Sequence, residues 1–308
     1  MNSTRDAYLG LFYGCALGDS LGHPYEFVYG RIPYKYELTS NGSVSDDTEM
    51  MMALFTSIVT EDGWKRDKVI QAYTRWVGSG VFDLGVNTRN LFCDGICFPD
   101  KMVQLYEANM KSEKTRPIHL WTQSNGCLIR CMPLIFCTHE TQQEDCALTN
   151  PHPTCLEASR LYFCMIEQCI QRTFTPILEL ASTIKSNDLR EAISDAISLA
   201  DLTQPGKRKV HQKRGWITHA IYFAVAMYHH SIQTFEEGMQ FVIGCHLDSD
   251  TDTNAAIAGA ILGCKLGFSN MIQEEKTAHM IDLINQPTSR PSIYQPRNIT
   301  SYVDQLYK

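Results

Sequence analysis

Glycine recurs at every fourth position of the segment Gly10-Leu11-Phe12-Tyr13-Gly14-Cys15-Ala16-Leu17-Gly18-Asp19-Ser20-Leu21-Gly22. The same spacing returns late in the chain, at Gly259, Gly263 and Gly267. Each glycine lowers helix propensity by about 1 kcal/mol relative to Ala. That cost is offset where a second helix, or a ligand, comes close to the backbone. We therefore predict that these two segments are helices at the centre of the fold.

Helical periodicity dominates the rest of the chain, whereas the alternation typical of strands is hard to find. It predicts helices over Asp46–Ile58, Leu156–Ile170, Thr175–Ile184, Leu189–Leu202 and Ile217–His229. No composition change divides the first 270 residues, so we predict one all-α domain over residues 1–270. The glycine-rich pattern stops there, so we predict that residues 271–308 form a C-terminal extension with a short docked helix.

Two acidic clusters each run directly into an apolar helical stretch: Ser45-Asp46-Asp47-Thr48 and Asp248-Ser249-Asp250-Thr251-Asp252-Thr253. Either cluster alone is also typical of a helix N-cap, and Asp46 with Glu49 approximates a capping box. Capping needs only one such residue, however, and adjacent carboxylates repel one another unless a cation neutralises them. Oxygen ligands favour magnesium, manganese or calcium. The clusters therefore predict a divided metal site.

An EF-hand is the first alternative for the second cluster, because Asp248, Asp250 and Asp252 fall at loop positions one, three and five. Position six is Thr253, where the EF-hand requires glycine. Position twelve is Gly259, where it requires a bidentate Glu. These two mismatches exclude a calcium-binding EF-hand.

Composition excludes several other classes of protein. With 308 residues, 44% hydrophobic and 20% charged, the chain resembles an ordinary globular protein. Its net charge of −7 argues against general nucleic-acid binding. No apolar segment is long enough to span a bilayer, so we expect no membrane association. We also expect a monomer.

Cysteine and lysine patterns bear on location. The twelve cysteines are scattered singly among apolar residues, which favours a reduced, cytoplasmic protein. Cys93 with Cys97 and Cys127 with Cys131 have wide zinc-ligand spacing, but no further ligand pair accompanies them. The basic run over residues 207–214 is typical of a solvated loop; a phosphate-facing rim or a nuclear localisation signal is the alternative.

Five ordered segments resemble the ADP-ribosylglycohydrolase family. They are Gly14–Gly22 with Pro24 and Glu26, Ser45–Met50, Asp83-Leu84-Gly85 with Thr88, Ser124–Arg130 with Pro133, and Asp250–Gly259. Together they cover roughly residues 8 to 270. The resemblance implies a compact, single-domain orthogonal helix bundle with a central dinuclear metal cleft. It also implies two divalent cations, Mg²⁺ or Mn²⁺, that hold the distal ribose of ADP-ribose.

The implied reaction is hydrolysis of the C1″ glycosidic bond between ADP-ribose and an acceptor. The acceptor is an arginine nitrogen, a serine oxygen or another ADP-ribose, so the expected partners are ADP-ribose and ADP-ribosylated proteins. Such hydrolysis passes through an oxocarbenium-like state, in which the acceptor must be stabilised as it leaves and a water must be activated. Two cations can fix the ribose hydroxyls and polarise water, while carboxylates complete the acid and base work.

The resemblance assigns these roles to particular residues. The implied metal ligands are Ser45, Asp46, Asp47, Asp250, Asp252 and Thr253. The catalytic carboxylates are Glu26, with a surface glutamate as the alternative, and Asp83. The implied substrate-binding residues are Ser124, Asn125, Gly126, His152 and Gly215, although the first three also suit an ordinary cap and turn.

Two departures from the family pattern keep other functions open. Asn150 stands where the family commonly has the histidine of a Thr-His pair, and His152 is the nearest replacement. Asp248-Ser249 replaces a pair of glycines before the closing metal motif. The alternatives are therefore a catalytically weak or inactive ADP-ribose-binding module of the same fold, and a structural protein without a ligand.

Overall fold

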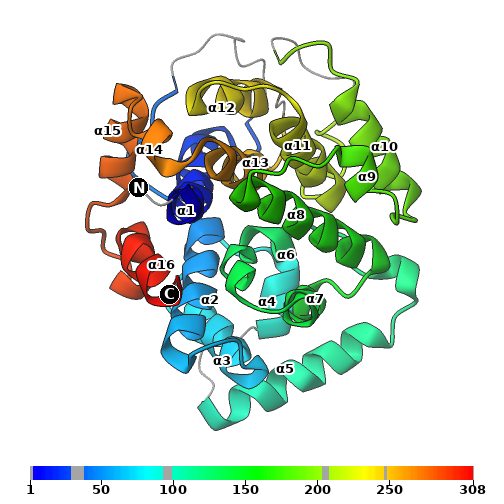
Figure 1. Cartoon of the computed structure of the whole chain (residues 1–308). Helices are drawn as coiled ribbons and strands as arrows, with labels where there is room; N and C mark the ends of the chain where they lie inside the picture. Colours follow the sequence, from blue (N-terminus) through cyan, green and yellow to red (C-terminus); the bar gives the residue numbers. More distant parts are fainter. Residues whose placement is uncertain (1–2, 29–37, 93–98, 203–207, 246–247, 308) are drawn as a thin grey trace.

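The computed structural model describes residues 3–28, 38–92, 99–202, 208–245 and 248–307, arranged as Figure 1 shows. The α-helices are α1 (Ser3–Gly22), α2 (Asp46–Glu61), α3 (Arg66–Val77), α4 (Val86–Phe92), α5 (Pro99–Lys114), α6 (Gly126–Ile129), α7 (His139–Thr149), α8 (Pro153–Gln171), α9 (Ile177–Leu180), α10 (Asn187–Ile197), α11 (Ile217–His229), α12 (Phe235–Gly244), α13 (Thr251–Leu266), α14 (Phe268–Met271), α15 (Glu275–Ile284) and α16 (Ile299–Leu306). No β-strand occurs in the described ranges, although an isolated antiparallel bridge joins Ser124 to Trp216. The predicted all-α class is confirmed.

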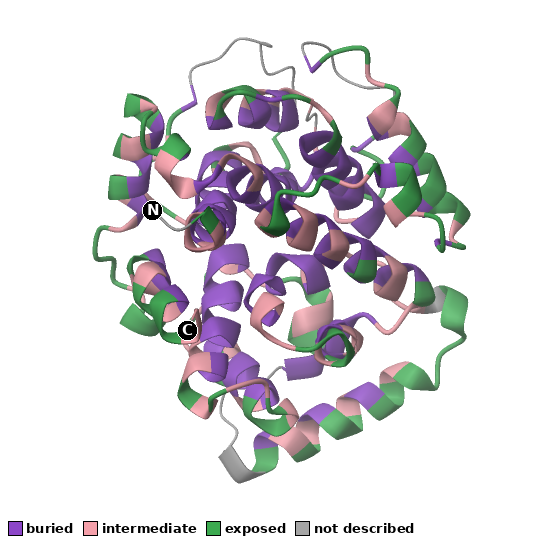
Figure 2. Cartoon of the chain, viewed as in Figure 1, coloured by how far each residue is buried: buried purple, intermediate pink, exposed green. Residues whose placement is uncertain are grey.

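Helices α1 and α13 form the centre of the molecule, and Figure 2 shows both as mostly buried. A Cβ atom placed on Gly14 would lie 2.2 Å from the carbonyl oxygen of Gly259. A Cβ atom on Gly10 would lie 2.1 Å from the carbonyl oxygen of Gly263. The two backbones are thus too close for any side chain between them. The prediction of two central glycine helices is confirmed.

The other helices surround this pair. Helices α11 and α12 pack against α13, α10 covers α11, and α2 and α8 pack against α1. Helices α14, α15 and α16 also contact α1, and α16 reaches α2. The residues after 270 therefore fold back onto the helix that begins the described chain. No helix in the described ranges is both long enough and apolar enough to cross a membrane.

Two predicted helices are shorter than expected. The helix predicted over Leu189–Leu202 ends at Ile197. Periodicity predicted a helix over Thr175–Ile184, but α9 covers only Ile177–Leu180. The side-chain Oε1 of Gln168 accepts a hydrogen bond from the backbone nitrogen of Thr175 at 2.9 Å, which holds that residue outside the helix. By contrast, α11 has the predicted bounds.

Candidate functional site

Helices α2 and α13 begin at the same place, so the two acidic clusters meet. Carboxylate oxygens of Asp47 on α2, Asp252 on α13 and Asp19 on α1 all lie within 4.8 Å of one another. All three side chains are buried. Three carboxyl groups from three helices therefore share one interior position.

A second group adjoins the first. Ligand atoms of His23, Glu26 and Asp252 also lie within 4.8 Å of one another. The short helical turn His23–Tyr25 follows α1 directly and places these residues beside the start of α13. Nδ1 of His23 lies 3.6 Å from Oδ2 of Asp252. Asp252 thus belongs to both groups, which together are rich in the oxygen atoms that bind hard divalent cations.

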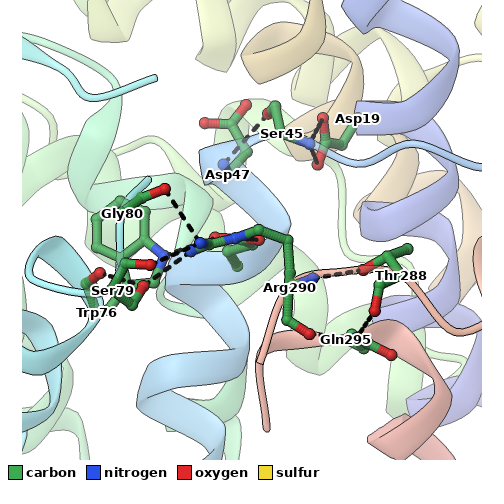
Figure 3. Close-up of polar contacts among 10 residues, drawn as sticks. Asp19, Ser45, Asp47, Trp76, Ser79, Gly80, Thr288, Arg290 and Gln295 are labelled. Carbon is green, nitrogen blue, oxygen red and sulfur yellow. Dashed lines mark hydrogen bonds and ion pairs between the residues drawn. The ribbon is translucent and has the colours of Figure 1, made fainter. Parts of the chain in front are cut away.

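Asp19 ties the central helix to the start of α2. Its carboxylate accepts hydrogen bonds from the backbone nitrogens of Ser45, at 2.9 Å, and Thr48, at 3.1 Å, as Figure 3 shows for Ser45. Burial raises the pKa of Asp19 although these bonds favour its charged form. The predicted site omitted Asp19. It is the one charged residue in the segment from Leu9 to Gly22, and that is the signal that would have identified it.

Ser45 caps α2: its hydroxyl accepts a hydrogen bond from the backbone nitrogen of Asp47 at 3.2 Å. The proposed capping box between Asp46 and Glu49 is therefore wrong, because Glu49 pairs with Arg290 instead. Oδ2 of Asp47 is buried and has no hydrogen-bond partner among the described residues. A buried, unpartnered carboxylate oxygen is costly in free energy unless a cation contacts it.

The start of α13 holds the remaining acidic residues. Asp250 is the N-cap, and its Oδ2 accepts a hydrogen bond from Asn125 at 2.8 Å. Oδ1 of Asp252 accepts one from the backbone nitrogen of Thr253 at 2.8 Å. Asp248, which has a positive φ of 52°, forms an ion pair with Arg214. Asp248 belongs to neither group of converging ligand atoms in the described residues.

The crowding of carboxylates changes their acidity. Burial, followed by repulsion from neighbouring carboxylates, raises the pKa values of Asp46, Asp47 and Asp252 well above the ordinary range. Burial and then the charge of Asp250 raise the pKa of Glu26 to about 7. Without a cation, the folded cluster therefore retains protons that ordinary carboxylates have already lost.

Asp83 lies in the loop between α3 and α4 and faces the same cluster. Its charge is the largest electrostatic contribution to the raised pKa of Asp46 after burial, and it also raises the pKa of Glu26. Oδ1 of Asp83 accepts a hydrogen bond from the backbone nitrogen of Leu84 at 2.7 Å. The adjacent Phe82 is exposed. The charge of Asp83 therefore acts on the other predicted catalytic carboxylate, Glu26.

The loop before α6 borders the cluster on another side. The backbone nitrogen of Asn125 donates to the carbonyl oxygen of Gly215 at 2.9 Å. A Cβ atom on Gly215 would lie 3.0 Å from Oδ2 of Asp250, so this glycine brings backbone directly to the acidic residues. A hollow of about 420 Å³ lies next to this loop. It is lined by Trp121, Gln123, Ser124, Lys213, Gly215 and Trp216.

A buried ion pair supports this loop from the interior. Nη1 of Arg130 donates to the carbonyl oxygen of Gly126 at 2.9 Å, and its Nε pairs with Asp145 at 2.9 Å. Both charged side chains are fully buried, and Tyr73 donates to the same carboxylate at 2.9 Å. The position of Gly126 is thus set by hydrogen bonds from the core.

Asn150 and His152 have local structural contacts. The buried Asn150 donates from Nδ2 to both the carbonyl oxygen and Oγ of Ser124, each at 3.1 Å. His152 caps α8, since its Nδ1 accepts from the backbone nitrogen of Thr154 at 3.1 Å. Asn150 therefore holds the Ser124 loop, and only Nε2 of His152 remains for another partner.

The other sequence alternatives have definite positions. Arg208 of the basic run is not solvated, because it pairs with Asp195 at 3.3 Å and donates to Thr218 at 2.7 Å. Lys207 lies outside the described residues, as do Cys93 and Cys97. In the described chain, no group of three metal-binding side chains includes Cys127 or Cys131.

Comparison with known proteins gives concordant matches. The model of the family described as ADP-ribosylglycohydrolase matches residues 1–300. The chain is 27% identical to the ADP-ribosyl-[dinitrogen reductase] glycohydrolase of Rhodospirillum rubrum over 182 residues, which are 52% of this chain and 58% of that protein. It is 24% identical to the putative ADP-ribosyl glycohydrolase L543 of Acanthamoeba polyphaga mimivirus over 187 residues, 51% of this chain and 53% of the relative. The chain thus spans about half the length of these curated relatives.

A solved structure shares the fold. It is described as an ADP-ribosylglycohydrolase-related protein complex, and it matches with a TM-score of 0.65 at 20% sequence identity. The match covers 92% of this chain and 98% of the other.

Proposed function

The chain belongs to the ADP-ribosylglycohydrolase family, and on that premise we propose that it hydrolyses the C1″ glycosidic bond between ADP-ribose and an acceptor. The acceptor is a protein side chain, such as arginine or serine, or another ADP-ribose. One observation carries this proposal: Asp19, Asp47 and Asp252 converge from three helices on one buried position. Helix capping does not require three converging carboxylates, and such a set of oxygen atoms suits a site that binds cations.

The residues present fit a pair of divalent cations, Mg²⁺ or Mn²⁺. The unpartnered buried oxygen of Asp47 and the raised carboxyl pKa values both support this fit. The proposed ligands are Ser45, Asp46, Asp47, Asp250, Asp252 and Thr253. When bound, the cations would supply positive charge that holds the ribose hydroxyls and polarises water. Asp19 supports the ligands by holding the start of α2.

Glu26 and Asp83 are the proposed acid and base. Ligand atoms of Glu26, His23 and Asp252 lie within 4.8 Å of one another, so the Glu26 carboxyl stands beside the proposed metal ligands, where a proton donor or acceptor is needed. Hydrolysis requires one proton to leave the attacking water and one to reach the departing acceptor. Glu26 is our leading candidate for these transfers, and Asp83 is the second carboxylate close to it.

The hollow beside Gly215 is the proposed position of the ADP half of the substrate. Ser124 lines this hollow, and the next residue, Asn125, donates to Asp250 in the acidic cluster. Asn125 and Gly126 are proposed substrate contacts beside it. Nζ of Lys213 lies 3.6 Å from the centre of the Trp216 ring. This pair offers a positive charge for the phosphates and a flat aromatic surface for the adenine ring of ADP. Nε2 of His152 is proposed as a more distant contact.

The test is the release of ADP-ribose from arginine-linked, serine-linked and polymeric substrates, each assayed with Mg²⁺, with Mn²⁺ and with EDTA. Release from one substrate that requires a divalent cation would establish the hydrolase and its acceptor together. Absence of release from all three, with ADP-ribose still bound in calorimetry, would favour the inactive binding module instead.

A further inference from the structure

One guanidinium joins the C-terminal part of the chain to the helix that carries the first acidic cluster. Arg290, in the segment between α15 and α16, donates from Nε and Nη2 to the two carboxylate oxygens of Glu49, at 2.6 and 2.8 Å. Glu49 is buried on α2, two residues after Asp47. Trp76 donates to the same carboxylate at 3.0 Å. The carboxylate of Glu49 is thus held from two sides.

The same guanidinium also holds the loop that leads to Asp83. Nη1 of Arg290 donates to the carbonyl oxygens of Ser79, at 2.8 Å, and Gly80, at 3.1 Å. Nη2 donates to Oγ of Ser79 at 2.8 Å. Figure 3 shows these contacts converging on Arg290. Gly80 has a φ of +76°, which turns the chain three residues before Asp83.

Arg290 is itself restrained. Its backbone nitrogen donates to Oγ1 of Thr288 at 3.2 Å, and its carbonyl oxygen accepts from Nε2 of Gln295 at 2.6 Å. The far end of the acidic loop is tied separately, because Asn87 on α4 donates to the carbonyl oxygen of Thr149 at 2.8 Å. The loop between Gly80 and Asn87 is therefore anchored at both ends, and Arg290 provides the first anchor.

We propose that Arg290 is a positioning residue, which locks the Ser79–Asp83 loop to α2 and so sets where Asp83 stands relative to the acidic cluster. The planar guanidinium can reach a carboxylate and two carbonyl oxygens at once, whereas a lysine ammonium is a single point of charge. The consequence for catalysis rests on the proposed function. The restraint of the loop does not, so the two can be tested separately.

The first measurement needs no activity: hydrogen exchange by mass spectrometry over residues 78–86. Arg290→Lys keeps a positive charge beside Glu49 but loses the planar guanidinium, which donates to several acceptors at once. We expect exchange in this loop to be faster by about tenfold, as for a local opening that has lost about 1.4 kcal/mol. The matched control is Arg5→Lys. Arg5 makes a similar two-bond pair with Asp304 on α16, at 2.7 and 3.0 Å, away from the loop. Unchanged loop exchange in Arg290→Lys would overturn the proposal.

The second measurement is a kinetic cycle with Asp83→Asn. Because a small misplacement of a catalytic group can cost about a hundredfold in rate, we expect Arg290→Lys to lower kcat at least about tenfold and to leave KM within about twofold. In the double variant, the Arg290 change should cost almost nothing further. If the losses in kcat from the two single variants multiply in the double variant, Arg290 does not act through Asp83.

A milder variant protects the test against misfolding. Ser79→Ala removes one acceptor of Arg290, together with the bond that the Ser79 hydroxyl donates to the carbonyl oxygen of Trp76 at 2.6 Å, and it leaves the Glu49 pair intact. Loop exchange should therefore change in the same direction as in Arg290→Lys but by a smaller amount. If the wild-type protein releases no ADP-ribose, the proposed function fails, and the exchange measurement still decides whether Arg290 holds the loop.

Discussion

Asn125 donates a hydrogen bond from Nδ2 to Oδ2 of Asp250 across 2.8 Å, and both side chains are buried. This bond joins the loop before α6 to the start of α13, so the proposed substrate-binding and metal-binding residues are physically linked. A hydrogen bond to a metal ligand fixes its orientation and typically contributes about 10- to 100-fold to metal affinity.

We therefore predict that Asn125→Ala weakens Mn²⁺ binding by at least about tenfold, as measured by isothermal titration calorimetry. Asn109→Ala is the matched control, because Asn109 also donates from Nδ2, but to the carbonyl oxygen of Leu91. Equal Mn²⁺ affinity in both variants would contradict the link.

Removing a charge from the converging carboxylates should separate activity from stability. Asp47→Asn and Asp252→Asn are each expected to abolish most turnover, because each takes away a proposed metal ligand. Both variants should fold, and in EDTA their Tm should equal or exceed that of the wild type, since one source of repulsion is gone. Turnover assays and thermal unfolding check the two halves of this prediction. Retained turnover in both variants would rule out the metal mechanism.

The pH dependence of stability follows from the raised carboxyl pKa values. A carboxyl group with a higher pKa in the folded state binds more protons when folded. Its contribution favours folding at low pH and is lost as pH rises through the folded pKa. For Glu26 this loss spans the range from 4.5 to about 7.

In EDTA, the acidic cluster should therefore lower the Tm as pH rises from about 5 to about 8, because the raised pKa values disfavour ionisation in the fold. Saturating Mg²⁺ should reduce that decline. Asp47→Asn should also reduce it in EDTA, since fewer carboxylates then repel one another. Thermal unfolding at several pH values provides the measurement, and a wild-type Tm in EDTA that rises over this range would be inconsistent with the prediction.

Because α1 packs closely on α13, a substitution at Gly14 should lower the stability of the protein far more than one at Gly85. In Gly14→Ala the new Cβ would meet the carbonyl oxygen of Gly259 at 2.2 Å, so the central helices must separate. We expect a loss of about 3 kcal/mol or more in the free energy of unfolding. Gly85→Ala is the control, because its nearest neighbour would be 3.9 Å away. Urea unfolding curves should show little change for Gly85→Ala, and similar curves for both variants would disprove close packing at Gly14.

Local patterns in the sequence were sufficient for most of the architecture. The interval of four residues between Gly10 and Gly14 predicted close contact with another helix, since only glycine leaves room for it. The apolar repeat over Ile217–His229 predicted the bounds of α11. The same periodicity failed over Thr175–Ile184, where the side chain of Gln168, at the end of the preceding helix, accepts from the backbone nitrogen of Thr175 and holds it outside a helix.

The sequence by itself determined the helical class, the central glycine helices and the candidate acidic residues, because periodicity and side-chain chemistry act over a few neighbouring residues. Only the tertiary structure decided which carboxylates converge. Asp19 lies beside Asp47 and Asp252 because α1 and α13 pack together at their glycines. Glu49 pairs with Arg290, which lies 241 residues away in the sequence. Such contacts depend on distances across the whole fold, which no local pattern encodes.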